Sequence, residues 1–285
     1  MKLVRFGAVG HEIPGVITDD PAGVFDVRSI TPTYDASFFA ADGLHRLRQA
    51  VERGTLPRLD TRDLRVGAPL ERPGKIVCIG LNFRRHAVES GAAIPTEPVV
   101  FMKAPNTIVG PHDDVVIPRN SQKTDWEVEL AVVIDTRASY LESPEAAAAC
   151  IAGYAVSNDV SEREFQLERG GQWDKGKSCA TFNPFGPWIV TKDEIDDPQQ
   201  LDMYLDVNDQ RLQSANTSDM IFPVDYLIWY LSQFMVLEPG DIVNTGTPAG
   251  VGLGLRPPRY LVPGDLMQLG IAGLGSQRSG VIAAL

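Results

Sequence analysis

Two glutamates two positions apart are the residues whose spacing points most directly to chemistry. Glu127 and Glu129 stand in the segment 125–134, which alternates between polar and apolar residues and then becomes wholly apolar. On a strand, residues i and i+2 lie on the same face, so the two carboxylates repel each other unless a cation lies between them. A solvated strand edge would also carry such a pair, but the apolar continuation indicates a strand that enters a core. We therefore expect a hard divalent cation with oxygen ligands here.

A third acidic residue follows another apolar run. Asp159 comes just after the strand expected over 151–156, where it could face Glu127 and Glu129 across the sheet. The dipeptide Asn158-Asp159 is also common in ordinary turns. Three carboxylates with no histidine or cysteine ligand favour Mg²⁺, with Mn²⁺ possible, over Zn²⁺.

A histidine and a glutamate form the second candidate group. Asn82 can cap a short helix that ends at Gly91. His86 and Glu89 are three positions apart, so they share a face of that helix. A carboxylate that holds an imidazole can serve as a general base that activates water. An exposed His–Glu pair on a helix surface is the simpler alternative.

Several cationic and polar residues could bind an acidic substrate. Lys175 and Lys177 lie in a loop that contains several glycines, and either lysine could bind a carboxylate or stabilise an enolate. The simpler alternative is a surface loop whose lysines contact only solvent. Arg163 and Gln166 lie one helical turn apart and could grip a substrate carboxylate. Thr247 belongs to a tight loop rich in hydroxyl and backbone donors.

The elements that must position these residues are mostly short strands. The pattern predicts one helix over 36–53, helical segments over 144–151 and 223–234, and a hairpin turn at Asn208-Asp209. The glycine-rich stretch 250–254 lacks the helix and lysine of a phosphate-binding loop, so we interpret it as a plain loop.

A polar region interrupted by proline and glycine residues predicts a domain boundary at residue 72, between a small N-terminal domain (1–72) and a larger domain (73–285). The expected strands cover 3–6, 23–27, 75–80, 99–103, 115–117, 126–135, 151–156, 201–207, 242–243 and 266–267.

Six motifs occur in a fixed order from about residue 73 to the C-terminus. They are Gly80-Leu81-Asn82-Phe83 with His86, Phe101-Met102-Lys103, Asp125-Trp126-Glu127-Val128-Glu129-Leu130, Asn158-Asp159-Val160-Ser161, Gly176-Lys177-Ser178 and Thr245-Gly246-Thr247-Pro248. Together they resemble the fumarylacetoacetate hydrolase superfamily. The resemblance implies an α+β, mostly β fold built on a rolled mixed β-sheet, a homodimer, and Mg²⁺ or a similar ion.

The resemblance also implies a role for each candidate residue. Glu127, Glu129 and Asp159 correspond to metal ligands, and His86 with Glu89 to a catalytic pair on a lid that closes over the substrate. Lys177 is expected both to bind substrate and to offset negative charge that develops in the reaction. The remaining expected substrate contacts are Lys103, Arg163, Gln166 and Thr247.

The segment 161–177 narrows the expected activity. It is similar to that of hydrolases acting on 2,4-diketo-3-deoxy acids derived from L-fuconate or L-rhamnonate. Such an enzyme would cleave the C3–C4 bond and release pyruvate and a 2-hydroxy acid such as L-lactate. Oxaloacetate decarboxylation and isomerisation of unsaturated dicarboxylates are alternatives within the superfamily. A non-catalytic protein that binds keto acids is an alternative of a different class.

Composition excludes several other partners. The 285 residues include 26 Lys and Arg against 37 Asp and Glu, a net charge of −11, which repels nucleic acid. The longest apolar run, 146–156, is too short to span a bilayer, and no basic amphipathic stretch suggests a membrane surface. Three scattered cysteines make no disulfide framework, and the first residues lack the apolar core of a signal peptide. We expect a cytoplasmic enzyme with a small-molecule substrate.

Overall fold

Two sheets built from β-branched and apolar runs organise the computed structural model, which describes residues 1–19 and 22–285. The larger sheet has the order β3-β2-β1-β14-β11-β10-β17-β5-β6, with β4 paired to β1. Its strands are β1 (Lys2–Phe6), β2 (Ile13–Asp19), β3 (Ala22–Asp26), β4 (Val66–Gly67), β5 (Ile76–Gly80), β6 (Val99–Lys103), β10 (Val128–Ile134), β11 (Ile151–Asn158), β14 (Ile189–Thr191) and β17 (Ile242–Asn244).

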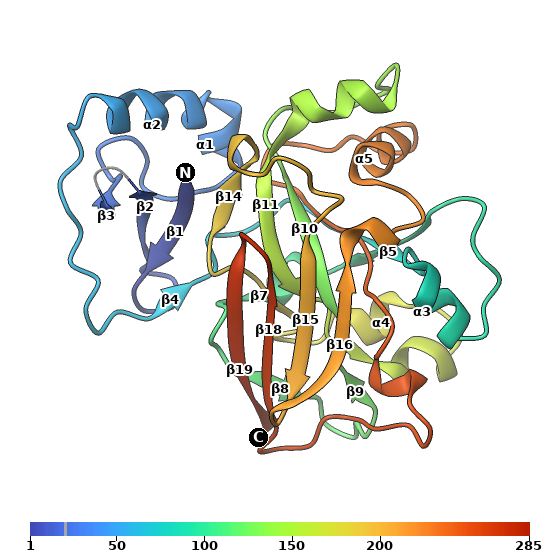
Figure 1. Ribbon diagram of the computed structural model, residues 1–285. Helices are drawn as coiled ribbons and strands as arrows, with labels where there is room; N and C mark the ends of the chain where they lie inside the picture. Colours follow the sequence, from blue (N-terminus) through green and yellow to red (C-terminus); the bar gives the residue numbers. More distant parts are fainter. Residues whose placement is uncertain (20–21) are drawn as a thin grey trace.

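The second sheet has five strands in the order β16-β15-β18-β19-β8 and lies in front of the first in Figure 1. Parallel pairs, such as β17 with β5 and β19 with β8, occur among antiparallel ones, so the sheets are mixed. The α+β, mostly β prediction is therefore confirmed. These strands are β8 (Val115–Ile117), β15 (Asp202–Val207), β16 (Gln210–Asn216), β18 (Leu266–Ile271) and β19 (Gly275–Ala283); two short ladders pair β9 (Thr124–Asp125) with β12 (Ser161–Glu162), and β7 (Ile108–Val109) with β13 (Asn183–Pro184).

Strand β10 is buried along its whole length because both of its faces are covered. Leu130 and Val132 point into a core shared with the five-stranded sheet. Ala131 and Val133 point into a second core that includes Leu3 of the N-terminal strands. Glu129, two positions before Ala131, lies on that second face. The fold thus places a carboxylate inside the protein.

The N-terminal strands continue the large sheet, since β1 pairs with β14. The helices α1 (Ala36–Ala40) and α2 (Gly43–Glu52) lie over these strands at one side of the molecule, at the left of Figure 1. The prediction of one helix over 36–53 was wrong, because Asp42 adopts a left-handed φ of 57° between the two helices. The division into domains at residue 72 stays a prediction.

The other helices are α3 (Arg84–Glu89), α4 (Asp174–Lys177) and α5 (Val224–Ser232). The segment Pro144–Cys150 forms a 3₁₀ helix, not an α-helix. Asn208 and Asp209 both have positive φ, 51° and 63°, as a tight hairpin turn between β15 and β16 requires. Within the described residues, no helix has both the length and the apolar character needed to cross a membrane.

Candidate active site and metal centre

The three predicted metal ligands converge where β10 and β11 pair. Val128 lies opposite Asn158 in this ladder, and the Asp159 backbone N–H donates to the Glu127 carbonyl at 2.9 Å. One carboxylate oxygen from each of Glu127, Glu129 and Asp159 lies within 4.8 Å of the others. Strand β10 starts only at Val128, so Glu127 precedes the strand and does not belong to it. The pairing of β10 with β11 nevertheless brings all three side chains together.

The chemistry of this donor set fits a divalent cation. All three carboxylates are buried, with exposures of 5% or less. Glu129 makes no ion pair among the described residues, and its carboxylate accepts a hydrogen bond from the Gly246 backbone N–H at 2.8 Å. Burial, with the nearby charges of Asp159 and Glu127, raises the pKa of Glu129 well above its usual value. A buried, uncompensated carboxylate is the environment that a metal ion relieves.

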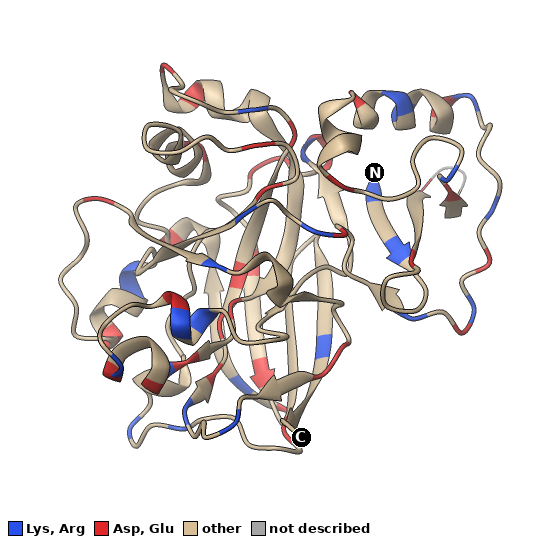
Figure 2. Cartoon of the chain, turned by 180° about the vertical axis from the view of Figure 1, so that it is seen from behind, with Lys and Arg blue, Asp and Glu red and all other residues tan. Residues whose placement is uncertain are grey.

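Two lysines lie against the acidic cluster. Lys177 of α4 places Nζ 2.7 Å from Glu127 Oε2 and 2.7 Å from Asp159 Oδ2. Lys103, at the end of β6, binds the other oxygen of Asp159 and the Val160 carbonyl. Burial lowers the pKa of Lys177, but Asp159 and Glu127 outweigh it and raise that pKa overall. Figure 2 shows acidic positions on the central strands and basic positions on short helical segments.

Arg163 and Gln166 meet as their spacing predicts, although residues 164–168 form a π-helical turn. Arg163 Nη1 donates to Gln166 Oε1 at 3.1 Å, and Nη2 lies 2.7 Å from Glu127 Oε1. Burial opposes ionisation of Glu127, but Lys177 and Arg163 outweigh it and hold the pKa of Glu127 at about 2. Glu127 is therefore a fixed anion at neutral pH.

His86 and Glu89 pair on α3, and the imidazole is buried rather than exposed. His86 Nδ1 lies 3.4 Å from Glu89 Oε2, while the two Glu89 oxygens accept from the Gly250 backbone N–H at 3.0 and 3.1 Å. The prediction that Asn82 caps this helix was wrong. Its side chain instead donates to the Thr245 and Phe222 carbonyls and so connects the start of α3 to two distant loops.

Most of the predicted site residues line one cavity of about 230 Å³, whereas Glu89, Asp159 and Lys103 do not. The predicted residues that line it are His86, Glu127, Glu129, Arg163, Gln166, Lys177 and Thr247. Thr247 donates its hydroxyl hydrogen to the Val128 carbonyl and accepts from Gln213 Nε2 at 2.8 Å. Lys103 does not line the cavity, and its contacts are with Asp159 and the Val160 carbonyl, so its predicted role in substrate binding stays a prediction.

Asp125 is a site residue that we did not single out. Its buried carboxylate accepts from Arg163 Nε at 2.8 Å and from the backbone N–H groups of Gly252 and Leu253 at 2.7 and 3.0 Å. It therefore holds both the arginine and the glycine-rich loop, which we expected to be a plain loop. A charged residue directly before the strand expected over 126–135 was the available signal.

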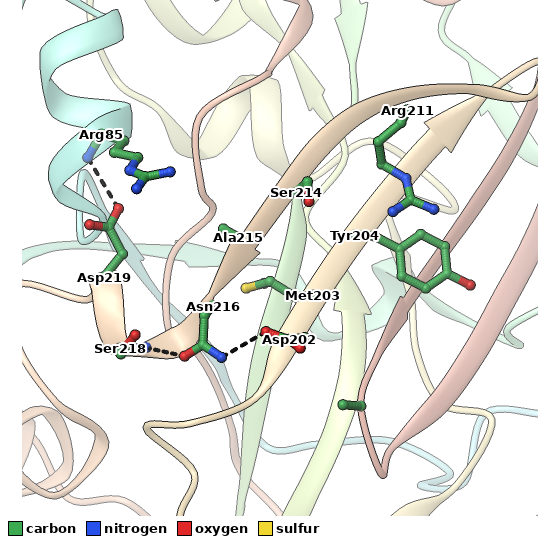
Figure 3. Close-up of a pocket in the computed structure, with 11 residues that line it drawn as sticks. Arg85, Asp202, Met203, Tyr204, Arg211, Ser214, Ala215, Asn216, Ser218 and Asp219 are labelled. Carbon is green, nitrogen blue, oxygen red and sulfur yellow. Dashed lines mark hydrogen bonds between the residues drawn. The ribbon is translucent and has the colours of Figure 1, made fainter.

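A larger hollow of about 710 Å³ lies on the outer side of β15 and β16 (Figure 3). Arg211 faces it but pairs with Asp206 and stacks over the Tyr204 ring at 4.3 Å. Asp202 accepts from the Asn216 amide at 2.8 Å. None of the predicted site residues lines this hollow, so it is separate from the acidic centre.

Comparisons with known proteins identify the family of this chain. A protein of Burkholderia multivorans with a provisional hydrolase name is 50% identical over 278 residues, covering 97% of both chains. A probable 2-hydroxyhepta-2,4-diene-1,7-dioate isomerase from Mycobacterium abscessus is 32% identical, with full coverage of both chains and a TM-score of 0.82. Maleylpyruvate hydrolase from Sphingobium sp. SYK-6, solved with manganese(II) and pyruvate, is 29% identical, with full coverage and a TM-score of 0.80. The profile described as fumarylacetoacetate (FAA) hydrolase C-terminal matches residues 75–282, and the chain belongs to this family of enzymes.

Proposed function

We propose that the protein is a metal-dependent hydrolase that cleaves the C3–C4 bond of a 2,4-diketo acid. The substrate that the sequence favours is L-2,4-diketo-3-deoxyrhamnonate or its fuconate counterpart, which would give pyruvate and L-lactate. The observation that carries the proposal is that buried His86, paired with Glu89, lines the same cavity as Glu127 and Glu129 of the acidic cluster. A related maleylpyruvate hydrolase solved with manganese(II) and pyruvate supports it.

The cavity residues account for binding of the pyruvate half. Glu127, Glu129 and Asp159 would hold the cation, which supplies Lewis-acid polarisation of the 2-oxo acid group when bound. Arg163 and Lys177 are the cations that line the cavity, so they can face the substrate carboxylate. Their fixed positive charge also stabilises negative charge that develops on the oxygen at C2.

His86 is placed to begin the hydrolysis. With Nδ1 directed at Glu89, Nε2 is the nitrogen able to accept a proton from water. The water oxygen then bonds to C4, and the C3–C4 bond breaks with its electron pair moving to C3. Protonation at C3 completes pyruvate, and C4 leaves as the carboxyl group of the second product. One water is consumed, and no oxidant is needed.

Isomerisation of an unsaturated dicarboxylate is the second candidate, because the similar isomerase from Mycobacterium abscessus has the same fold. Oxaloacetate decarboxylation would use the same acidic centre. Neither reaction incorporates a water oxygen into an organic product. This difference in atom balance separates both candidates from hydrolysis.

The test offers the Mg²⁺-loaded protein a panel of 2,4-diketo acids and oxaloacetate in ¹⁸O-labelled water. We expect pyruvate plus a second acid that carries one ¹⁸O in its carboxyl group, and no turnover after EDTA treatment. An isomer of unchanged mass, or carbon dioxide from oxaloacetate alone, would replace the hydrolase proposal with one of the other two. Binding of diketo acids without any product would indicate a non-catalytic protein.

A further inference from the structure

The chemistry of the cavity changes from its floor to its rim. The charged lining residues Glu127, Glu129, Arg163 and Lys177 are all buried, so they form the floor. The lining residues that reach solvent are mostly apolar. These rim residues are Gly80, Leu81, Ser90, Ala92, Leu167, Trp173 and Leu253; Ser90 carries a polar but uncharged side chain, and Leu167 is 44% exposed.

We propose that the site takes a monocarboxylate whose far end is uncharged, so that dicarboxylates are poor ligands. This inference rests on the proposed function, because it assumes that a 2-oxo acid group occupies the floor. A substrate held there by its carboxylate must extend its tail along the apolar rim. A second carboxylate in that position would lose hydration without gaining an ionic partner.

The ion-pair network that contains the floor residues reaches charge balance with a single anion. When all are ionised, the four carboxylates of Asp125, Glu127, Glu129 and Asp159 face three cations, Lys103, Lys177 and Arg163. One negative charge is left over, and a divalent ion changes that to one positive charge. One substrate carboxylate neutralises it, whereas a dicarboxylate would leave an excess negative charge in a buried site.

No other lysine or arginine among the described residues lines the cavity. Three cations near the rim in the chain already have partners, and Arg84 on α3 is exposed and does not line the cavity. Arg169 pairs with Glu164, Lys175 donates to the Arg169 carbonyl, and Arg256 donates to carbonyls of its own loop, residues 253–255. On α3, Arg85 extends into the separate outer hollow, as Figure 3 shows.

Two five-carbon acids give a matched test, because 2-oxopentanoate and 2-oxoglutarate differ only in a terminal methyl or carboxylate group. Their dissociation constants for the Mg²⁺-loaded protein are measured by titration calorimetry. We expect 2-oxopentanoate to bind at least about tenfold more tightly. Equal affinity, or tighter binding of 2-oxoglutarate, would overturn the inference and leave the proposed function standing. If neither acid nor pyruvate binds, the proposed function itself fails, and the inference fails with it.

A rim variant tests the position of the tail. Leu167→Arg adds a cation at a partly exposed position, where folding should tolerate it, and Leu167→Gln is the neutral control. We expect Leu167→Arg to shift the affinity ratio towards 2-oxoglutarate by several-fold, while Leu167→Gln leaves the preference for 2-oxopentanoate in place. An unchanged ratio in Leu167→Arg would show that the tail does not lie along this rim.

Discussion

The imidazole of His86 combines burial with a held orientation. Glu89 lies beside one ring nitrogen, and the Gly250 backbone N–H fixes that glutamate from the other side. A surface His–Glu pair would have neither the cavity nor the backbone donor. These contacts favour a role for His86 in proton transfer over a role in helix stability alone.

Replacing His86 tests this role. If His86 is the base that activates water, His86→Ala should lower kcat for diketo acid hydrolysis by about 10²–10⁴-fold. Pyruvate binding should change little, because the acidic centre and Arg163 hold that end of the ligand. Glu89→Gln should act in the same direction, since the amide no longer charges or orients the imidazole. Steady-state kinetics and pyruvate calorimetry measure the two effects.

Oxaloacetate decarboxylation supplies the internal control, since that reaction needs no attacking water. The comparison uses kcat at saturating oxaloacetate, so the weak binding expected of this dicarboxylate does not enter the ratio. The ratio of hydrolase to decarboxylase kcat should therefore fall in His86→Ala. Equal losses in both reactions would assign His86 to closure of the α3 segment and would remove water activation from the mechanism.

At the scale of elements, the site depends on contacts between distant segments. Asp125 precedes β10, yet its carboxylate binds the backbone of Gly252 and Leu253 and the side chain of Arg163. One residue thus positions a cation that lines the cavity and a loop whose Leu253 lines the rim. Asp125 does not itself line the cavity, so its role is positioning.

Asp125→Asn should weaken the hold on both the Arg163 side chain and the loop at Gly252. The amide cannot form the ion pair with the arginine, and its NH₂ group would face the backbone N–H donors. A disrupted buried charged hydrogen bond costs about 1–3 kcal/mol, so we expect the Kd for pyruvate to rise by about tenfold or more, and KM to rise more than kcat falls. Asp241→Asn is the matched control: Asp241 is also fully buried and accepts backbone N–H groups, from Lys75 and Glu238. That variant should lose stability without weakening pyruvate binding; equal weakening in both would refute the positioning role.

Sequence patterns predicted the local part of this site and missed the long-range part. The i, i+2 spacing of Glu127 and Glu129 and the i, i+3 spacing of His86 and Glu89 are local geometry, so the partners could be read from the chain. The contact of Asp125 with Gly252 joins residues 127 positions apart, and no local pattern encodes it. The helix break at Asp42 was missed for a different reason, since apolar periodicity continues across a single left-handed residue.

At the scale of the whole molecule, the fold stabilises a buried cluster of like charges. The β10–β11 ladder and both cores hold Glu127, Glu129 and Asp159 together, although Glu129 has no ionic partner of its own among the described residues. Close carboxylates repel in a buried site. Without a cation, this cluster should subtract from the free energy of unfolding.

A divalent ion should therefore stabilise the whole protein and not only activate it. A ligand that binds only the folded state at one hundred times its Kd adds about 2.7 kcal/mol, so the melting temperature should rise by several degrees with saturating Mg²⁺ or Mn²⁺ and fall again with EDTA. Glu129→Gln is the control, because it removes one ligand and one buried charge while its amide oxygen can still accept from Gly246. We expect the metal-free variant to be at least as stable as the metal-free wild type, since the repulsion is relieved, and its melting temperature to respond little to the ion. Differential scanning calorimetry measures both; an equal metal-induced rise in the two proteins would place the cation away from Glu129 and contradict the site described here.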